Sequence, residues 1–209
     1  MHTFSSKAYW SERYSNGGTS GAGSYGRLAL YKAAVVDGFL KNNHVQSVLE
    51  LGCGDGHQLS LLRHIKSYVG VDVSETVVGA CRQKFPSKRY EFIQDVQLPS
   101  DFSVELVLSL DVIFHLVEDD VFDKYMRSLF LRAEKYVIIY SSNFDAPGAA
   151  VHVRHRNITD FVQKYFPEFC LKAYVPNLYP FEENNPDNTS FCDFMIFARD
   201  GHSVVLDVP

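Results

Sequence analysis

The stretch Ser-Val-Leu-Glu-Leu-Gly-Cys-Gly-Asp-Gly at residues 47–56 decides the fold. Its first five residues favour a strand, and glycines at positions 52, 54 and 56 interrupt that strand. A pattern of helical spacing follows from residue 57. A strand, a glycine turn and a helix in this order are typical of an open parallel sheet, whose ligands bind beyond the carboxyl ends of the strands.

Segments of strand and helix length alternate on both sides of this stretch. The order predicts an α/β fold: a Rossmann-like, doubly wound, mostly parallel sheet of seven strands. The last two strands have no helix between them, so we expect them to pair antiparallel at one edge. The expected strands are 47–51, 68–73, 89–93, 104–110, 136–140, 169–175 and 191–198, and the expected helices are 28–42, 57–65, 75–84 (capped by Ser74), 118–133 and 157–166.

The 209 residues suffice for one domain with a full hydrophobic core. We expect a single domain over 1–209, with an N-terminal lid and helix in 1–45 and the Rossmann-like core in 46–209. Residues 15–26 are rich in glycine and serine, so no regular element is expected there.

Composition excludes several classes of protein. Lysine and arginine total 20 against 25 for aspartate and glutamate, a net charge of −5 that disfavours nucleic-acid binding. No apolar run approaches the roughly 20 residues of a membrane span, and the first residues do not resemble a signal peptide. The four cysteines form no C-x-x-C pair, which disfavours a zinc ribbon or a disulfide scaffold and favours a reducing, cytoplasmic location.

Asp72 ends the second expected strand, 20 residues after Gly52. A carboxylate at this place accepts hydrogen bonds from both ribose hydroxyls of an adenosine ligand. Both NAD and S-adenosylmethionine bind to this architecture. The NAD fingerprint G-x-G-x-x-G fails here, because His57 stands at the third glycine position.

Four motifs in this order resemble those of the class I S-adenosylmethionine-dependent methyltransferases. They are Val-Leu-Glu-Leu-Gly-Cys-Gly-Asp-Gly at 48–56, Gly-Val-Asp-Val-Ser at 70–74, Gln-Asp-Val at 94–96 and Leu-Ser-Leu-Asp-Val-Ile-Phe-His-Leu at 108–116. The resemblance covers about residues 45–141, and it implies S-adenosylmethionine as the cofactor.

The resemblance also implies a set of cofactor-binding residues. Glu50, Gly52, Cys53, Gly54 and Gly56 would line the methionine half of the cofactor. Asp72 would hold the ribose with Val73 beside it, Asp95 and the Val96 backbone would meet the adenine amino group, and Leu110 and Asp111 would lie near the sulfonium.

The opening Tyr9-Trp10-Ser11-Glu12-Arg13-Tyr14 resembles the aromatic-plus-arginine start of many small-molecule methyltransferases. We expect Tyr9 and Arg13 at the cofactor, with the guanidinium on its carboxylate. Together with the glycine-rich loop, the segment would form a lid that excludes water. The alternative is a disordered tail, which its aromatic residues disfavour.

His115 is the candidate base, because an oxygen nucleophile of high pKa needs one. Asp111 lies four residues earlier and would orient the imidazole if this stretch is helical. The alternative is a histidine that only caps or packs.

A second cluster, His152, Arg154, His155 and Arg156, follows the fifth expected strand. Two arginines and two histidines suit an anionic group of the acceptor, and Tyr140 would border the same pocket. The cluster could equally be a solvated basic turn. Metal binding by its histidines with His115 has little support, because no cysteine or acidic partner has ligand spacing, and no metal is expected.

These observations favour a methyltransferase that acts on an oxygen of a small molecule or a sugar. N-methylation of a small amine is the alternative enzyme. A catalytically silent cofactor-binding module and a dehydrogenase remain further readings.

Overall fold

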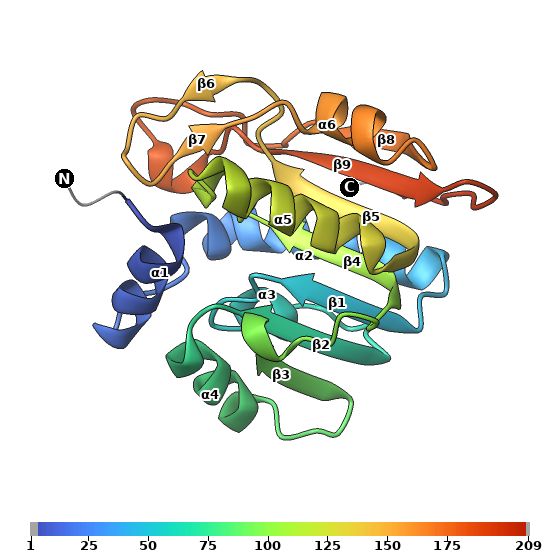
Figure 1. Ribbon diagram of the computed structural model, residues 1–209, viewed down its shortest axis with the longest axis horizontal. Coiled ribbons are helices and arrows are strands. Elements are labelled where there is room, and N and C mark those ends of the chain that lie inside the picture. Colours follow the sequence, from blue (N-terminus) through green and yellow to red (C-terminus); the bar gives the residue numbers. More distant parts are fainter. Residues whose placement is uncertain (1–3, 208–209) are drawn as a thin grey trace.

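Seven strands form one mixed sheet in the computed structural model, which describes residues 4–207 (Figure 1). Their order across the sheet is β3-β2-β1-β4-β5-β9-β8. Neighbouring strands from β3 to β5 pair in parallel, and β9 pairs antiparallel with both β5 and β8. The predicted doubly wound sheet with an antiparallel final pair is confirmed. The strands are β1 Ser47–Leu51, β2 Ser67–Asp72, β3 Tyr90–Gln94, β4 Val104–Leu110, β5 Ala133–Ser141, β8 Phe169–Val175 and β9 Asp193–Arg199.

Helices cover both faces of the sheet (Figure 1). The alternation of side chains along β4 shows why: Leu106 and Leu108 pack into the core under α2, whereas Val107 packs into the core under α5. One face carries α2 Gly26–Asn42, α3 His57–Ser60 and α4 Glu75–Lys84, and the other carries α5 Asp119–Leu131 and α6 Ile158–Tyr165. Short elements complete the chain: η1 Ala22–Ser24, η2 Asp95–Gln97, η3 Ile113–His115, the β6 Ala146–Pro147 and β7 Arg154–His155 ladder, and η4 Pro186–Asn188.

Two elements differ from the prediction. The helix expected over 57–65 ends at Ser60, because Asp37 of α2 accepts hydrogen bonds from the backbone N–H groups of Arg63 and His64 and holds this segment in a turn. A helix not foreseen, α1 Ser6–Ser15, precedes the glycine-rich loop, with Ser5 as its N-cap. Its sequence is largely polar, so no amphipathic periodicity marks it.

The strand order reverses between β1 and β4, which places the glycine turn after β1 at the switch point of the sheet. In residues 4–207, no helix is both long and apolar enough to span a bilayer.

Candidate functional site

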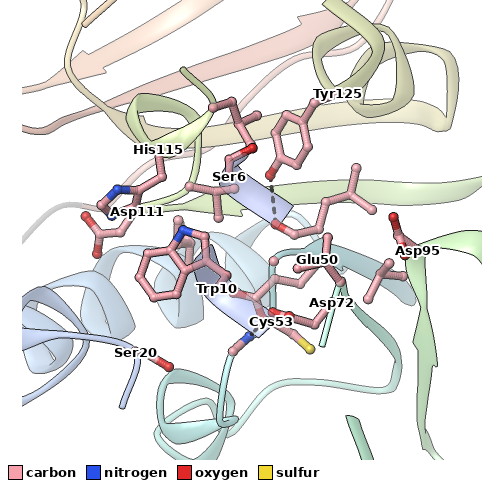
Figure 2. Close-up of a pocket in the computed structure, with 18 of the residues that line it drawn as sticks. Ser6, Trp10, Ser20, Glu50, Cys53, Asp72, Asp95, Asp111, His115 and Tyr125 are labelled. Carbon is pink, nitrogen blue, oxygen red and sulfur yellow. Dashed lines mark hydrogen bonds between the residues drawn. The ribbon is translucent and has the colours of Figure 1, made fainter. Parts of the chain in front are cut away.

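A cavity of about 470 Å³ opens at the carboxyl ends of β1, β2 and β4. The glycine turn, Asp72 and Asp95 line one part, and Asp111 and His115 line another (Figure 2). Trp10 of α1 closes over the space between them. The structure therefore brings residues from four separate motifs into one cavity.

The glycine turn needs its glycines for two distinct reasons. Gly52 and Gly54 have φ values of +82° and +54°, in the left-handed region that side chains disfavour. A Cβ on Gly52 would lie 2.5 Å from a methyl of Val112, and one on Gly54 would lie 2.5 Å from the Ser20 Oγ. Both glycines and Cys53 line the cavity, whereas Gly56 lies behind it, at the start of α3.

Two buried carboxylates, Asp72 and Glu50, face this turn (Figure 2). Asp72 accepts hydrogen bonds from the backbone N–H groups of Gly54 at 3.1 Å and Ser74 at 3.0 Å. Burial raises the pKa of Asp72 to about 6, although these hydrogen bonds act to lower it. Glu50 accepts a hydrogen bond from the Tyr68 hydroxyl at 2.5 Å, and burial raises its pKa to about 7. The site thus concentrates acceptors for hydroxyl and amino groups.

Asp95 lines the cavity at the end of β3 and forms an ion pair with Lys7 of α1 at 3.0 Å. Val73 also lines the cavity. The Val96 side chain is 74% exposed and does not line it. The Lys7 contact was not foreseen from the sequence, and it joins α1 to this end of the site.

The N-terminal segment lies over the cavity as a closed cover. Trp10 and Tyr14 line it, and the Tyr14 hydroxyl is 3.0 Å from the Ser20 Oγ. Ser20 in turn accepts a hydrogen bond from the backbone N–H of Asp55 in the glycine turn. Hydrogen bonds of Ser20 therefore connect this cover to the glycine turn.

The structure places Tyr9 and Arg13, which were expected at the cofactor, outside the lining of the cavity. The Tyr9 ring stacks on His152 with centroids 4.8 Å apart, and the Arg13 Nε donates to the Thr19 carbonyl at 2.7 Å. Neither residue lines the cavity. One helical face can point only some of these residues inward, and here Trp10 and Tyr14 take those positions, spaced four apart.

Asp111 follows β4 in a left-handed backbone conformation, with φ at +60°. Its carboxylate pairs with Lys32 of α2, whose side chain is 1% exposed. No hydrogen bond joins Asp111 to His115 in the described residues, and residues 113–115 form a 3₁₀ turn rather than the α-helix on which the expected orientation depended. Lys32 was not predicted as a site residue, although a lysine four residues after Leu28 on the apolar stripe of a helix is a signal of a buried charge.

His115 is oriented by a backbone carbonyl instead. Its Nδ1 lies 3.0 Å from the carbonyl oxygen of His152, which can only accept, so Nδ1 carries the proton and Nε2 has a free lone pair. Burial lowers the pKa of His115 to about 4, and its ring packs edge-on against Trp10 with centroids 4.8 Å apart. His115 is therefore neutral at neutral pH.

Residues 48–132 match the family model described as a methyltransferase domain. The match covers 85 of the 209 residues. No curated protein matches the chain by sequence. The matched residues hold the glycine turn, both buried carboxylates and His115.

Solved structures of methyltransferases share the fold of this chain. Magnesium protoporphyrin IX methyltransferase from Synechocystis PCC 6803, with bound SAM, is 16% identical with a TM-score of 0.68, over 96% of this chain and 100% of that one. The N-methyltransferase NodS from Bradyrhizobium japonicum WM9, in complex with S-adenosyl-L-homocysteine, is 15% identical with a TM-score of 0.62, over 79% and 83%. The methyltransferase domain of bacterial CtHen1-C is 19% identical with a TM-score of 0.61, over 81% and 97%.

The basic cluster after β5 does not line the cavity. Arg154 and Arg156 donate to the carbonyl of Val117 and pair with Asp119, and Arg156 also donates to the Leu116 carbonyl. Both guanidiniums therefore hold the loop before α5 in place, which favours the alternative of a structural basic turn over an anion site.

The other residues that were predicted to bind the methyl acceptor also lie outside the lining of the cavity. The buried Tyr140 hydroxyl accepts a hydrogen bond from Asn177 at 2.7 Å, and the Nδ1 of His155 lies 2.9 Å from the Ser142 Oγ. Neither residue lines the cavity. His152 acts through its carbonyl on His115. In the described part of the chain, no group of three or more metal-ligating side chains is present.

One further residue was missed. The hydroxyl of Tyr125 in α5 lies 2.7 Å from the Leu51 carbonyl and 2.8 Å from the Ser109 Oγ (Figure 2). It ties together the ends of β1 and β4 and lines the cavity. A tyrosine in an amphipathic helix carries no sign of such a contact in its sequence.

Proposed function

We propose that the protein is an S-adenosylmethionine-dependent methyltransferase that methylates a hydroxyl of a small molecule or sugar. The observation that carries the proposal is the meeting of the glycine turn, Asp72 and His115 in one cavity at the switch point of the sheet. The glycine turn and Asp72 at one end of this cavity suit an adenosine ligand, and His115 at the other end suits a nucleophile that must lose a proton.

The residues present fit this cofactor. The turn at Gly52 and Gly54 lets backbone approach the ligand, and a Cβ at Gly54 would fill the space against Ser20. The ionised Asp72 would accept from the ribose hydroxyls, and Asp95 would accept from the adenine amino group once it shares or releases Lys7. Leu110 and Asp111 lie at the acceptor end.

The cofactor supplies an activated methyl group on a positively charged sulfur. The protein then contributes alignment, exclusion of water and the removal of one proton. Trp10 and Tyr14 cover the cavity and exclude water. Asp72 has no lysine or arginine within hydrogen-bond distance in the described chain, so its ionised carboxylate favours a positively charged ligand.

His115 would take the acceptor proton on Nε2 as the methyl moves. The proton on His115 would come from the acceptor hydroxyl, whose oxygen would receive the methyl group that the positively charged cofactor supplies, so that charge and atoms balance. The resulting imidazolium keeps its Nδ1–H bond to the His152 carbonyl. Burial makes His115 a weak base, so the proton would leave late, when the oxygen already carries positive charge.

The low pKa of His115 also favours a second candidate, N-methylation of a small neutral amine. Such an amine attacks with its own lone pair and needs no strong base. The two functions differ in their dependence on His115.

Methyl transfer from labelled S-adenosylmethionine to a panel of alcohols, phenols and amines tests the proposal. With a hydroxyl acceptor, His115→Ala should lower turnover by roughly 10²–10⁴ and leave the affinity for S-adenosylhomocysteine nearly unchanged. Near-normal turnover of His115→Ala on an amine would instead support N-methylation. No transfer to any class, with normal cofactor binding, would contradict both.

A further inference from the structure

The imidazole of His152 stacks on two other rings. It lies nearly parallel to the Tyr9 ring of α1, with centroids 4.8 Å apart and an angle of 12° between the planes. It also stacks on the imidazole of His115, with centroids 5.5 Å apart and an angle of 21°. Burial lowers the pKa values of both histidines, so the two imidazoles are neutral at neutral pH and do not repel each other. The three rings therefore link the cover of the cavity to the candidate base.

The backbone of His152 holds the same imidazole of His115. Its carbonyl oxygen lies 3.0 Å from the Nδ1 of His115. His115 thus contacts one residue twice, through the ring and through the carbonyl of His152. Because a carbonyl can only accept a hydrogen bond, its position decides that Nδ1 carries the proton and that Nε2 keeps its lone pair.

His152 lies in the turn between β6 and β7, and this hairpin has little stability of its own. Its ladder joins only two residue pairs. Arg154 anchors β7 to the Val117 carbonyl and to Asp119, but the turn itself has no such anchor, and its Val151 side chain is 79% exposed. An isolated two-stranded hairpin is marginally stable at best in water. The place of the turn therefore depends on the rings that pack against His152.

α1 brings Tyr9 to this hairpin, and both lie at the same end of the molecule (Figure 1). At the start of the helix, the backbone N–H of Ser6 donates to the Glu118 carboxylate at 2.8 Å. One residue after Tyr9, Trp10 packs edge-on against His115 inside the cavity (Figure 2). Tyr9 itself does not line the cavity, so contact with a cofactor does not account for its place on His152.

We propose that Tyr9 and His152 are positioning residues for His115: Tyr9 of the closed cover holds the His152 ring, and the His152 carbonyl then keeps the proton of His115 on Nδ1 and leaves Nε2 free. This inference rests on the proposed function, and it adds that closure of the cover prepares the base as well as excluding water. With α1 away from the cavity, His152 loses one of its two stacking partners and the turn is held less firmly. His115 can then carry its proton on Nε2, where it cannot take a second one.

NMR of the ring nitrogens tests this inference on the full chain with isotope-labelled histidines, at neutral pH and saturated with S-adenosylhomocysteine. The signals that disappear in His115→Gln are those of His115. We expect the wild type to carry the proton on Nδ1. Tyr9→Ala should lower the ratio of the Nδ1–H form to the Nε2–H form by about 5-fold, the effect of one aromatic contact on an equilibrium. Tyr9→Phe should keep the wild-type ratio, because it keeps the ring.

Variants of His152 separate the ring from the carbonyl. His152→Ala keeps the backbone carbonyl and removes only the ring, so a purely local role of the carbonyl predicts no change. We expect the ratio to fall at least as far as in Tyr9→Ala, and no further when Tyr9→Ala is added, because both changes break the same stack. Tyr165→Ala is the matched control and should keep the wild-type ratio, since Tyr165 is a ring of α6 that is 40% exposed and lies outside the cavity lining.

A wild-type ratio in Tyr9→Ala or in His152→Ala, or independent effects that add in the double variant, would overturn the proposal. A fall in Tyr9→Phe or Tyr165→Ala as large as that in Tyr9→Ala would do the same. Failure of the proposed function is distinguishable, because it appears as near-normal methyl transfer by His115→Ala. Failure of this inference appears instead in the ring nitrogens of variants that keep His115.

Discussion

Replacing Lys32 with methionine should destabilise the fold strongly, because it leaves the Asp111 carboxylate without its counter-charge. The two side chains are 1% and 14% exposed, so water cannot replace the lysine. Removing one partner of a buried ion pair costs about 3–5 kcal/mol, and the slight exposure of Asp111 favours the lower end, about 3 kcal/mol. Glu50 also loses a nearby cation that lowers its pKa, which adds to the loss.

Urea denaturation, followed by circular dichroism, measures this change in the free energy of unfolding. The double variant Lys32→Met with Asp111→Asn should be more stable than Lys32→Met alone by about 2 kcal/mol, because the unpaired charge is gone. Lys124→Met is the control: Lys124 and Asp120 form an exposed pair, worth less than about 1 kcal/mol. If Lys32→Met costs no more than Lys124→Met, or the double variant is no more stable than the single one, the argument for the buried pair is wrong.

Three further predictions concern the site itself. Burial raises the pKa of Asp72 to about 6, and ribose hydroxyls bind its ionised form, so affinity for S-adenosylhomocysteine should rise as pH increases from about 5 to about 7; a rise that persists in Asp72→Asn would exclude Asp72 as its source. The ring of His115 should show no titration by NMR above pH of about 5, because burial lowers its pKa to about 4; a midpoint near 6.5 would contradict this. Hydrogen exchange over residues 5–26 should slow when S-adenosylhomocysteine binds, because α1 and its loop cover the cavity; identical exchange with and without the ligand would refute the lid.

The sequence predicted the core of the fold well because its signals there are local. The apolar strand, the glycine turn and the acid at the end of the next strand all lie within residues 47–72, and the structure places them together as expected. Strands that are buried on both faces, such as β4, can also be predicted from their continuous apolar sequence.

Contacts between distant segments were less predictable. Arg156 donates to the carbonyl of Leu116, 40 residues earlier in the chain, and the sequence of the basic cluster gives no sign of this contact. Asp111 pairs with Lys32 and His115 binds the His152 carbonyl, and neither the left-handed backbone of Asp111 nor the 3₁₀ turn at residues 113–115 has a clear sequence signal. The ion pair of Lys7 with Asp95 likewise joins segments that are 88 residues apart.

In the N-terminal third of the chain, the position of Lys32 could be predicted from the sequence, whereas the orientation of α1 could not. Lys32 lies on the apolar face of α2, and a lysine in such a position indicates a buried partner for its charge. The choice between Tyr9 and Trp10 at the cavity has no comparable signal. It depends on how α1 rotates about its axis, and the polar sequence of α1 does not fix that rotation.

Isothermal titration of the full chain with S-adenosylhomocysteine, and separately with NAD, tests the central claim most directly. We expect saturable binding of S-adenosylhomocysteine at one site per chain and no binding of NAD. Asp72→Ala should weaken that binding by about 1–3 kcal/mol, because buried ribose hydroxyls lose their acceptor, while circular dichroism confirms that the variant is folded. Absence of S-adenosylhomocysteine binding, equally tight binding of NAD, or an unchanged affinity in the folded Asp72→Ala variant would contradict the account.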